Sequence, residues 1–219
     1  PGANLISYTC DQSAFVQDII QDIEITSVIG EGMATTYNPI LGWVGSLITL
    51  EPGAGYWVKS NSDVDFSFDC PESEVTSRDY LEVPIKDYVQ STKQAFYFFE
   101  EIPEIEIGDV VRAYNGDILV GSRVWNGQFT DIPVMGQDFQ IETEGYLTNG
   151  QKPSFKLFKA NGEQLDIIAD IPHFEDNGIF LIQKTNKFGL MPEDFMLSYA
   201  YPNPFNPTTT INFQVPFTS

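Results

Sequence analysis

The feature that most constrains the fold of this chain is a succession of short apolar runs separated by turn-forming residues. After residue 80 these runs occupy residues 95–99, 109–114, 118–125, 154–159 and 178–183. The turn signals beside them are Asn115-Gly116-Asp117, Asn126-Gly127 and Asn161-Gly162. Tight asparagine–glycine turns join neighbouring antiparallel strands. The pattern therefore predicts an antiparallel β-sandwich over residues 80–185.

Residues 1–71 combine further β-rich runs with one helical pattern. Phe15, Ile19, Ile20 and Ile23 fall at helical spacing, which predicts a helix over residues 11–23. Asp11 or Ser13 could cap that helix. The β-rich runs lie at residues 3–9, 25–29, 42–50, 56–59 and 64–68. We expect a small α+β module with one helix.

The remaining stretches are polar or rich in proline. Residues 72–79 lack hydrophobic periodicity and are predicted to be a linker. Residues 186–219 contain five prolines, which exclude a long helix and predict an extended arm in which only residues 208–215 alternate. The chain begins without methionine inside a strand-like run, so we expect it to be a fragment of a longer protein.

Charge restricts the classes of partner. The chain has 11 basic and 31 acidic residues, a net charge of −20. Binding to nucleic acid or to anionic lipid needs clustered Lys and Arg, so we expect neither to be a partner of this chain. The acidic residues are spread along the chain, which is typical of a solvated surface. No apolar run approaches the roughly 20 residues that span a bilayer.

The chain has two cysteines, Cys10 and Cys70, each just after a strand-like run. We predict a disulfide between them; the alternative is two buried free thiols. Closing a loop of this length stabilises a fold by about 4 kcal/mol in the chain-entropy model. A disulfide would indicate an oxidising, extracytoplasmic compartment.

Catalytic motifs are sparse. The single imidazole is His173, in a loop that contains proline, and no GxSxG motif accompanies it. Glu100, Glu101 and Glu104 crowd together, but a solvated rim is the simpler interpretation. We therefore predict a chain that is not an enzyme and that has no cofactor, apart from the calcium candidates that follow.

Two groups of oxygen-bearing side chains could bind calcium. Asp109, Asn115 and Asp117 flank a predicted hairpin, where side-chain oxygens and loop carbonyls could meet at calcium distances. Asp63, Asp65 and Asp69 would share one face of a strand, where they repel one another unless solvated or neutralised by a cation. Neither group has EF-hand spacing.

The tryptophans are candidates for a sugar-binding platform. Trp43, Trp57 and Trp125 could present flat rings to sugars, together with Tyr56 and Tyr114. The alternative is burial in the core, which the apolar neighbours of Trp57 and Trp125 favour. Trp43, which is flanked by glycines, is the best candidate.

The segment Tyr201-Pro202-Asn203-Pro204-Phe205-Asn206-Pro207, followed by Thr-Thr-Thr-Ile-Asn-Phe, resembles the start of the type A sorting domains of the type IX secretion system. In that family the motif opens a sandwich of several more strands, which the outer-membrane export machinery recognises. The chain stops after the first of those strands. The resemblance therefore implies a partial sorting signal and a parent protein that is secreted or held at the outer cell surface.

The upstream residues are similar to accessory modules of such secreted proteins. The similarity rests on residues 4–7, 29–32, 43–47 and 50–58 in the first module, and on residues 107–121 and 155–158 in the second, which is expected to be Ig-like. The resemblance implies a non-catalytic spacer, adhesion or assembly region whose partners are glycans or further copies of the protein. The alternative is a carbohydrate-binding accessory module of a secreted hydrolase; a small hydrolase is a weaker third hypothesis.

Overall fold

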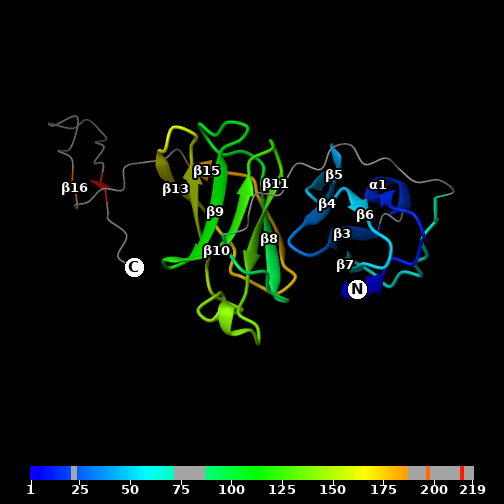
Figure 1. Cartoon of the computed structure of the whole chain (residues 1–219). Helices are drawn as coiled ribbons and strands as arrows, with labels where there is room; N and C mark the ends of the chain where they lie inside the picture. Colours follow the sequence, from blue (N-terminus) through cyan, green and yellow to red (C-terminus); the bar gives the residue numbers. More distant parts are fainter. Residues whose placement is uncertain (21–23, 72–86, 187–195, 198–212, 215–219) are drawn as a thin grey trace, which may run out of the picture. The chain divides into compact units, whose positions relative to one another are not determined.

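The computed structural model describes residues 1–20, 24–71, 87–186, 196–197 and 213–214 (Figure 1). Residues 1–186 form one compact unit and residues 187–219 form a second. The described chain is mainly β with several antiparallel sheets and one short α-helix, so the predicted fold class is confirmed. The predicted linker at residues 72–79 lies outside the described residues. So does most of the predicted arm at residues 186–219.

The N-terminal part of the first unit is built on a five-stranded antiparallel sheet with the order β1-β7-β3-β4-β5. Its strands are β1 (Gly2–Ser7), β3 (Ile25–Ile29), β4 (Ala34–Asn38), β5 (Gly42–Gly45) and β7 (Gly55–Ser60). The helix α1 (Val16–Ile19) and the pair β2 (Ala14–Phe15) and β6 (Thr49–Leu50) supply further residues to its core. Val16, Ile19 and Leu50 cluster there with Tyr56 and Val58 of β7.

The predicted helix over residues 11–23 is much shorter in the structure. Its N-cap is Phe15, which makes no side-chain cap, so the expected capping by Asp11 or Ser13 is wrong. Ser13 instead donates its hydroxyl hydrogen to a Glu51 carboxylate oxygen, 2.6 Å away. Ala14 and Phe15 pair with β6, so extended backbone occupies the positions where the helix was expected to begin. Residues 21–23 lie outside the described residues.

The strand predicted at residues 64–68 is also absent from the structure, where this segment has irregular backbone. Phe66 and Phe68 alternate as they would in a strand, and both pack against the core beneath the first sheet. Phe68 contacts Tyr8 edge to face, with ring centroids 4.9 Å apart. The alternation therefore reflects side-chain burial without strand pairing.

The second part of the first unit contains two sheets. The larger has the order β10-β9-β12-β13-β15 and the smaller the order β11-β8-β14. Their strands are β8 (Gln94–Phe99), β9 (Val110–Asn115), β10 (Ile118–Val124), β11 (Thr130–Met135), β12 (Ser154–Phe158), β13 (Gln164–Ala169), β14 (Ile179–Ile182) and β15 (Thr185–Asn186). All pairs are antiparallel except β14 with β8, which is parallel. The predicted antiparallel arrangement therefore holds with one parallel exception.

Strand β8 is buried along its whole length because sheets lie on both of its faces (Figure 1). On one face, Tyr97 and Phe99 contact Phe155 of β12, with ring centroids 5.2 Å and 5.1 Å apart. On the other, Phe96 and Phe98 cluster with Ile29 and Ala34 of the first sheet. A strand covered on both faces has a continuous apolar sequence, as residues 95–99 have. The smaller sheet is thus the middle one of three layers.

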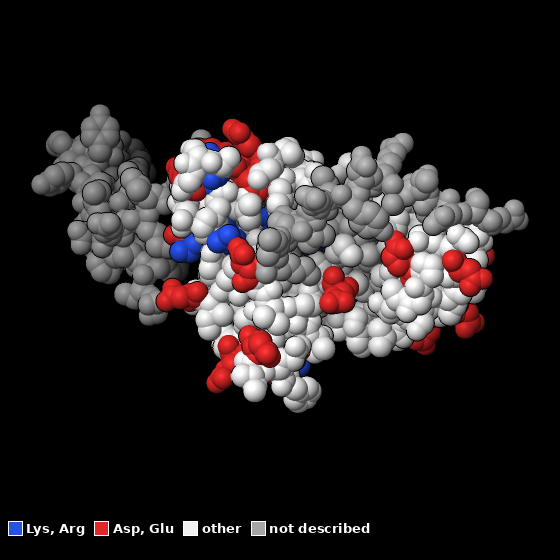
Figure 2. Space-filling model, viewed as in Figure 1, with Lys and Arg blue, Asp and Glu red and all other residues white. Residues whose placement is uncertain are grey.

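Two further features of the described chain are the distribution of its acidic side chains and the character of its helices. Figure 2 shows Asp and Glu side chains in separate groups over the visible face, without one dominant acidic patch. In the part of the chain that the structure describes, no helix has the length and apolar character needed to cross a membrane. The second unit contributes one described strand pair, β16 (Met196–Leu197) with β17 (Phe213–Gln214).

Candidate functional site

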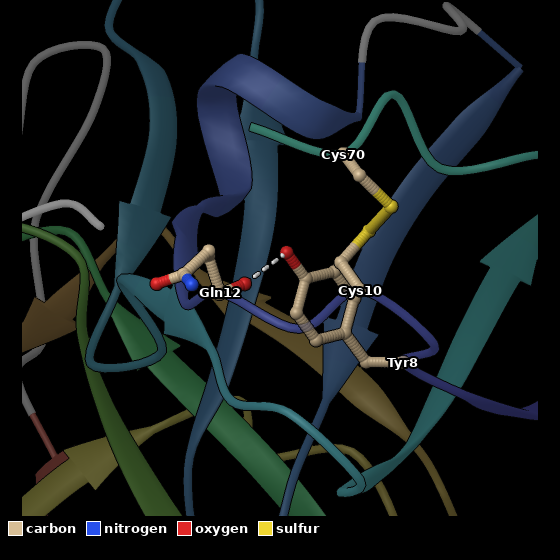
Figure 3. The surroundings of a disulfide bond; sticks show 4 residues. All are labelled: Tyr8, Cys10, Gln12 and Cys70. Atoms are coloured by element: carbon tan, nitrogen blue, oxygen red, sulfur yellow. Dashed lines mark hydrogen bonds between the residues drawn. A yellow bond between two sulfur atoms is a disulfide. The ribbon is translucent and has the colours of Figure 1, made fainter. Parts of the chain in front are cut away.

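The predicted disulfide is confirmed: Cys10 is bonded to Cys70 across a sequence separation of 60 residues (Figure 3). Cys10 follows β1 and is buried, whereas Cys70 ends the irregular segment after β7. Nearby, Tyr8 donates its hydroxyl hydrogen to the carbonyl oxygen of Gln12, 2.8 Å away. Burial raises the pKa of the Tyr8 hydroxyl, and Glu51 and Tyr56 raise it further. The bond therefore links the segment after β7 covalently to the segment that follows β1.

The structure does not bring the three tryptophans together in one platform. Trp125 is buried after β10. Trp57 packs against the cluster that contains Phe96 and Phe98, whereas Trp43 packs against the core on α1 and β6. Trp43 is half-buried and stands edge to face with the exposed Tyr37, with ring centroids 5.7 Å apart. Tyr56 is buried and Tyr114 is half-buried beside Lys156, so among the described residues that were predicted to bind sugar, Trp43 with its neighbour Tyr37 remains the candidate surface.

The first predicted calcium site is not assembled. Asp109 and Asn115 lie at opposite ends of β9, so a single ion cannot contact both. The buried Asp109 carboxylate instead accepts hydrogen bonds from the amides of Glu106 and Ala160, at 2.9 Å and 3.2 Å. Asn115 donates its side-chain amide hydrogen to the carbonyl oxygen of Gly145 at 2.9 Å, and Asp117 is exposed in the β9–β10 turn.

The second predicted calcium site is not formed. The strand that was expected to place its three aspartates on one face is absent from the structure. Asp63, Asp65 and Asp69 are all exposed on irregular backbone, and Asp63 forms an ion pair with the N-terminal amine at 3.3 Å. Among the described residues, no group of three or more His, Cys, Asp or Glu side chains is placed to hold a metal ion.

The remaining candidate residues are one histidine and three glutamates, which lie in a loop and beyond the end of a strand. His173 is exposed in the loop between β13 and β14, beside Pro172, whose carbonyl oxygen accepts a hydrogen bond from Tyr97. Glu101 and Glu104 are exposed beyond the end of β8, and Glu100 is half-buried. The sorting motif at Tyr201–Pro207 lies outside the described residues.

A buried polar junction between the first sheet and the sheet below it is the most elaborate arrangement in the described chain. Arg123 of β10 donates through Nη2 to Asp131 Oδ2 of β11, at 3.0 Å, and to the carbonyl oxygen of Gly32, at 2.7 Å. Its Nε donates to the Asp131 carbonyl oxygen at 2.9 Å. The Asp131 side chain is 2% exposed and that of Arg123 is 16% exposed.

Asp131 also binds the first sheet directly. Its Oδ2 accepts hydrogen bonds from the Ser46 hydroxyl at 2.7 Å and from the Ala34 amide at 3.3 Å. Burial raises the pKa of the Asp131 carboxyl, against the lowering effects of Arg123, Ser46 and the Ala34 amide. A buried carboxylate needs such partners because desolvation otherwise costs several kcal/mol.

Gln94, at the start of β8, completes the junction. Its Oε1 accepts a hydrogen bond from the Gly32 amide at 3.0 Å, and its Nε2 donates to the Gly30 carbonyl oxygen at 2.8 Å. The turn between β3 and β4 thus has its backbone groups bound by side chains about 60 to 90 positions away in the sequence. No motif or spacing in the sequence pointed to these residues. The available signal was a charged or amide side chain inside an otherwise apolar run. Such a side chain is buried with its neighbours and therefore requires a polar partner.

A hollow of about 400 Å³ lies beside the junction, between the first sheet and β14. Aromatic side chains of Phe98, Phe129 and Phe180 line it, together with Thr36, Lys59 and Leu181. This volume falls within the roughly 300–1,000 Å³ that is usual for ligand pockets. The junction could therefore serve a function by fixing two sheets, and the hollow could serve one by receiving a partner.

Comparison with known proteins yields no family model, no curated protein and no solved structure that matches this chain.

Proposed function

We propose that this chain is a non-catalytic, rigid spacer and assembly region of an exported bacterial protein that is secreted or displayed at the cell surface. The observation that carries the proposal is the buried Arg123–Asp131 ion pair, which holds the turn between β3 and β4 against β10 and β11. A spacer has to keep its modules in a fixed arrangement, and this junction does so.

Separating the two sheets would break buried contacts between them, and this loss opposes relative motion. Domain interfaces within one chain are often polar and permit relative motion. Here, motion would unpair Asp131 from the Ala34 amide and Ser46, and would separate Phe96 and Phe98 from Ile29. Each hydrogen bond to a charged group that is lost in this way contributes roughly 1.5–3 kcal/mol. The two parts of the first unit are therefore expected to move as one body.

The non-catalytic part of the proposal is supported by how the polar side chains of the described residues are used. The buried Asp131 and Asp109 carboxylates accept hydrogen bonds from backbone amides, which fixes local structure. His173 is exposed in its loop. The two aspartates therefore have structural partners in place of the base–nucleophile pairing that nucleophilic catalysis requires.

Nitrogen-15 relaxation of the full 219-residue chain tests the rigid arrangement. We expect the amides of residues 1–71 and those of residues 87–186 to report one rotational correlation time. As a matched comparison, Asp131→Ala should give the two regions different values if the junction holds them. Independent correlation times in the unaltered chain would exclude a rigid spacer.

The export route in the proposal rests on the motif at Tyr201–Pro207 and agrees with the Cys10–Cys70 disulfide, which suits an oxidising compartment. Replacing Asn203-Pro204-Phe205 by Gly-Ser-Gly in the full-length parent protein should prevent its delivery outside the cell. Fractionation of cells and medium measures this. Undiminished delivery of the altered protein would refute the sorting role.

Carbohydrate binding is a second candidate function, favoured by the Tyr37–Trp43 pair alone. Both side chains lie on the β4–β5 hairpin, and Tyr37 is exposed. If they bind sugar, Trp43→Ala should remove retardation of the chain in native gels that contain soluble polysaccharides. Ile48→Ala, at another exposed apolar position, should leave it unchanged.

A further inference from the structure

The loop between β11 and β12 holds two large apolar side chains in solvent. Phe139 is fully exposed and Ile141 is 84% exposed. We name residues 137–145 the knob loop. A short 3₁₀ helix (Ile141–Thr143) lies within it, and Glu142 and Glu144 are exposed beside the apolar pair.

Asp138 fixes the shape of the knob loop. Its carboxylate accepts hydrogen bonds from the Thr92 amide at 2.9 Å, the Gln140 amide at 2.9 Å and the Thr143 hydroxyl at 2.8 Å. The Thr143 hydroxyl also accepts a hydrogen bond from the Asp138 amide at 3.1 Å. Phe139 and Ile141 are therefore presented by an ordered loop, so little conformational entropy is lost when they bind.

The hollow beside β14 has the complementary character. Phe180, Ile179 and Val44 are half-buried in its apolar wall, and Leu181 at its rim is 46% exposed, whereas Phe98 and Phe129 are themselves buried. Lys59 is the one charged residue among the described residues that line it, and no acidic residue lines it, although the chain contains 31 acidic residues. An aromatic side chain accompanied by carboxylates therefore suits this hollow both in polarity and in charge.

We infer that the knob loop of one copy docks into the hollow of a second copy, with Phe139 and Ile141 against Phe180 and Leu181 and with Glu142 or Glu144 near Lys59. The inference deepens the proposed assembly role and rests on it. The knob loop and the hollow share no residue, so a single contact between two copies is asymmetric and leaves one free knob and one free hollow. Such contacts build open chains or rings, of which the smallest is a dimer with two reciprocal contacts.

One such contact buries little area, so it is expected to be weak, with a Kd in roughly the 0.1–1 mM range. The net charge of −20 makes copies repel one another at long range. At physiological ionic strength the Debye length is about 8 Å, which screens that repulsion but leaves direct contacts in place. Many copies on one surface would raise the effective concentration.

Sedimentation equilibrium of the full chain at physiological ionic strength, up to about 1 mM protein, tests the inference at the expected Kd. The average mass should rise above the monomer value of 24.6 kDa as concentration increases. Phe139→Ser should weaken association at least about tenfold, since it removes a hot-spot aromatic. Ile107→Ser, at another exposed position outside both surfaces, is the matched control and should associate like the unaltered chain.

Charge reversal identifies the surface that receives the knob loop. Leu181→Glu should abolish association because it places a carboxylate against Glu142 and Glu144, whereas Leu181→Lys should preserve it. Glu142→Lys with Glu144→Lys should weaken association of the otherwise unaltered chain, because it brings lysines against Lys59. Each of these positions is exposed, so the variants are expected to fold.

A mixture of two defective variants gives the sharpest result. Phe139→Ser keeps an intact hollow and Leu181→Glu keeps an intact knob loop, so an equimolar mixture should form a heterodimer and nothing larger. The inference is overturned if the unaltered chain stays monomeric, if Phe139→Ser associates normally, or if the mixture forms no heterodimer. A monomeric chain with one rotational correlation time would reject this contact and leave the spacer function intact.

Discussion

Asp131 and Arg123 show how a single residue can decide the arrangement of a whole unit. Asp131 stands within β11, every residue of which is buried, and its partners Ala34 and Ser46 lie 97 and 85 positions earlier. A buried charge is tolerated only when it is paired and hydrogen-bonded. The ion pair therefore selects the one packing of the first sheet in which both charges are satisfied.

The first prediction concerns removal of one partner of this pair. Asp131→Ala should lower the free energy of unfolding by roughly 3–5 kcal/mol, because it leaves the guanidinium of Arg123 without its carboxylate. Urea denaturation of the full chain measures the change.

The double variant Arg123→Met with Asp131→Leu is the control for this prediction. Replacing both charges by apolar side chains removes the desolvation penalty, so it should recover most of the stability. A loss below about 1 kcal/mol for Asp131→Ala would instead be typical of a surface ion pair.

The second prediction concerns the pH dependence of Asp138. Partial burial alone would raise the pKa of this carboxyl, but hydrogen bonds from Thr92, Gln140 and Thr143 outweigh burial and hold its pKa far below the usual value. A pKa that is lower in the folded state than the unfolded value of about 3.9 stabilises the fold at higher pH. This stabilisation should be complete above about pH 5 and decline as pH falls below about 4.

Hydrogen exchange at the Thr92 and Gln140 amides measures this effect. After correction for intrinsic rates, their protection should be constant between pH 7 and pH 5 and should fall toward pH 3. Asp138→Asn should lower the protection at pH 7 and remove its pH dependence. Equal pH profiles for both chains would show that Asp138 does not organise the knob loop.

Among the elements, β10 of the larger sheet can lie close against β11 of the smaller sheet only because Gly121 has no side chain. A Cβ on Gly121 would overlap the carbonyl oxygen of Pro133 in β11 and lie 2.7 Å from its carbonyl carbon. A break in the register of β10 against β9 lies just before this residue. Close approach of two backbones is a usual reason for glycine within a strand.

The third prediction follows from that approach. Gly121→Ala should destabilise the chain by about 1–3 kcal/mol, since β10 and β11 must move apart. The urea midpoint should fall while the m-value stays the same. Gly55→Ala in β7 is the control, because its Cβ would meet Leu5 Cδ1 at 3.6 Å and the Ile6 carbonyl oxygen at 3.9 Å, both ordinary contacts, so it should be neutral or slightly stabilising.

Elements also show where periodicity misleads. Phe15, Ile19 and Ile20 have helical spacing, yet only Val16–Ile19 is helical, because Ala14 and Phe15 pair with β6. Phe66 and Phe68 alternate without forming a strand. Periodicity reports which side chains are buried, whereas tertiary contacts decide which backbone conformation buries them.

At the scale of the whole molecule, the disulfide and the junction act on the same body. The fourth prediction is that Cys10→Ala with Cys70→Ala lowers the stability of residues 1–186 by up to about 4 kcal/mol. Because the first sheet covers one face of β8, its weakening should shift a single cooperative transition of the unit. Urea denaturation followed by tryptophan fluorescence measures the shift.

The variant that lacks both cysteines provides its own control, since reductant should not change its unfolding curve. Reductant should lower the midpoint of the unaltered chain by the same amount as the double substitution. A biphasic curve, in which residues 87–186 keep an unchanged transition, would contradict the coupling of the two parts.

Much of the local structure of this protein could be predicted from the order of its residues alone. Short apolar runs and asparagine–glycine turns predicted β-strands, and two cysteines predicted the Cys10–Cys70 bond. These features depend on neighbouring residues or on a single obligatory pairing. The sequence could therefore establish the mainly β fold class without knowledge of how the sheets pack.

Only the tertiary structure decided which sheets face one another and which side chains meet. The predicted calcium ligands Asp109 and Asn115 lie at the two ends of β9, Trp43 and Trp57 pack against separate clusters, and Asp131 binds the Ala34 amide, 97 positions earlier. Contacts between residues so far apart in sequence depend on the packing of whole sheets. No local pattern along the chain encodes that packing, so the junction and the hollow became visible only in the folded molecule.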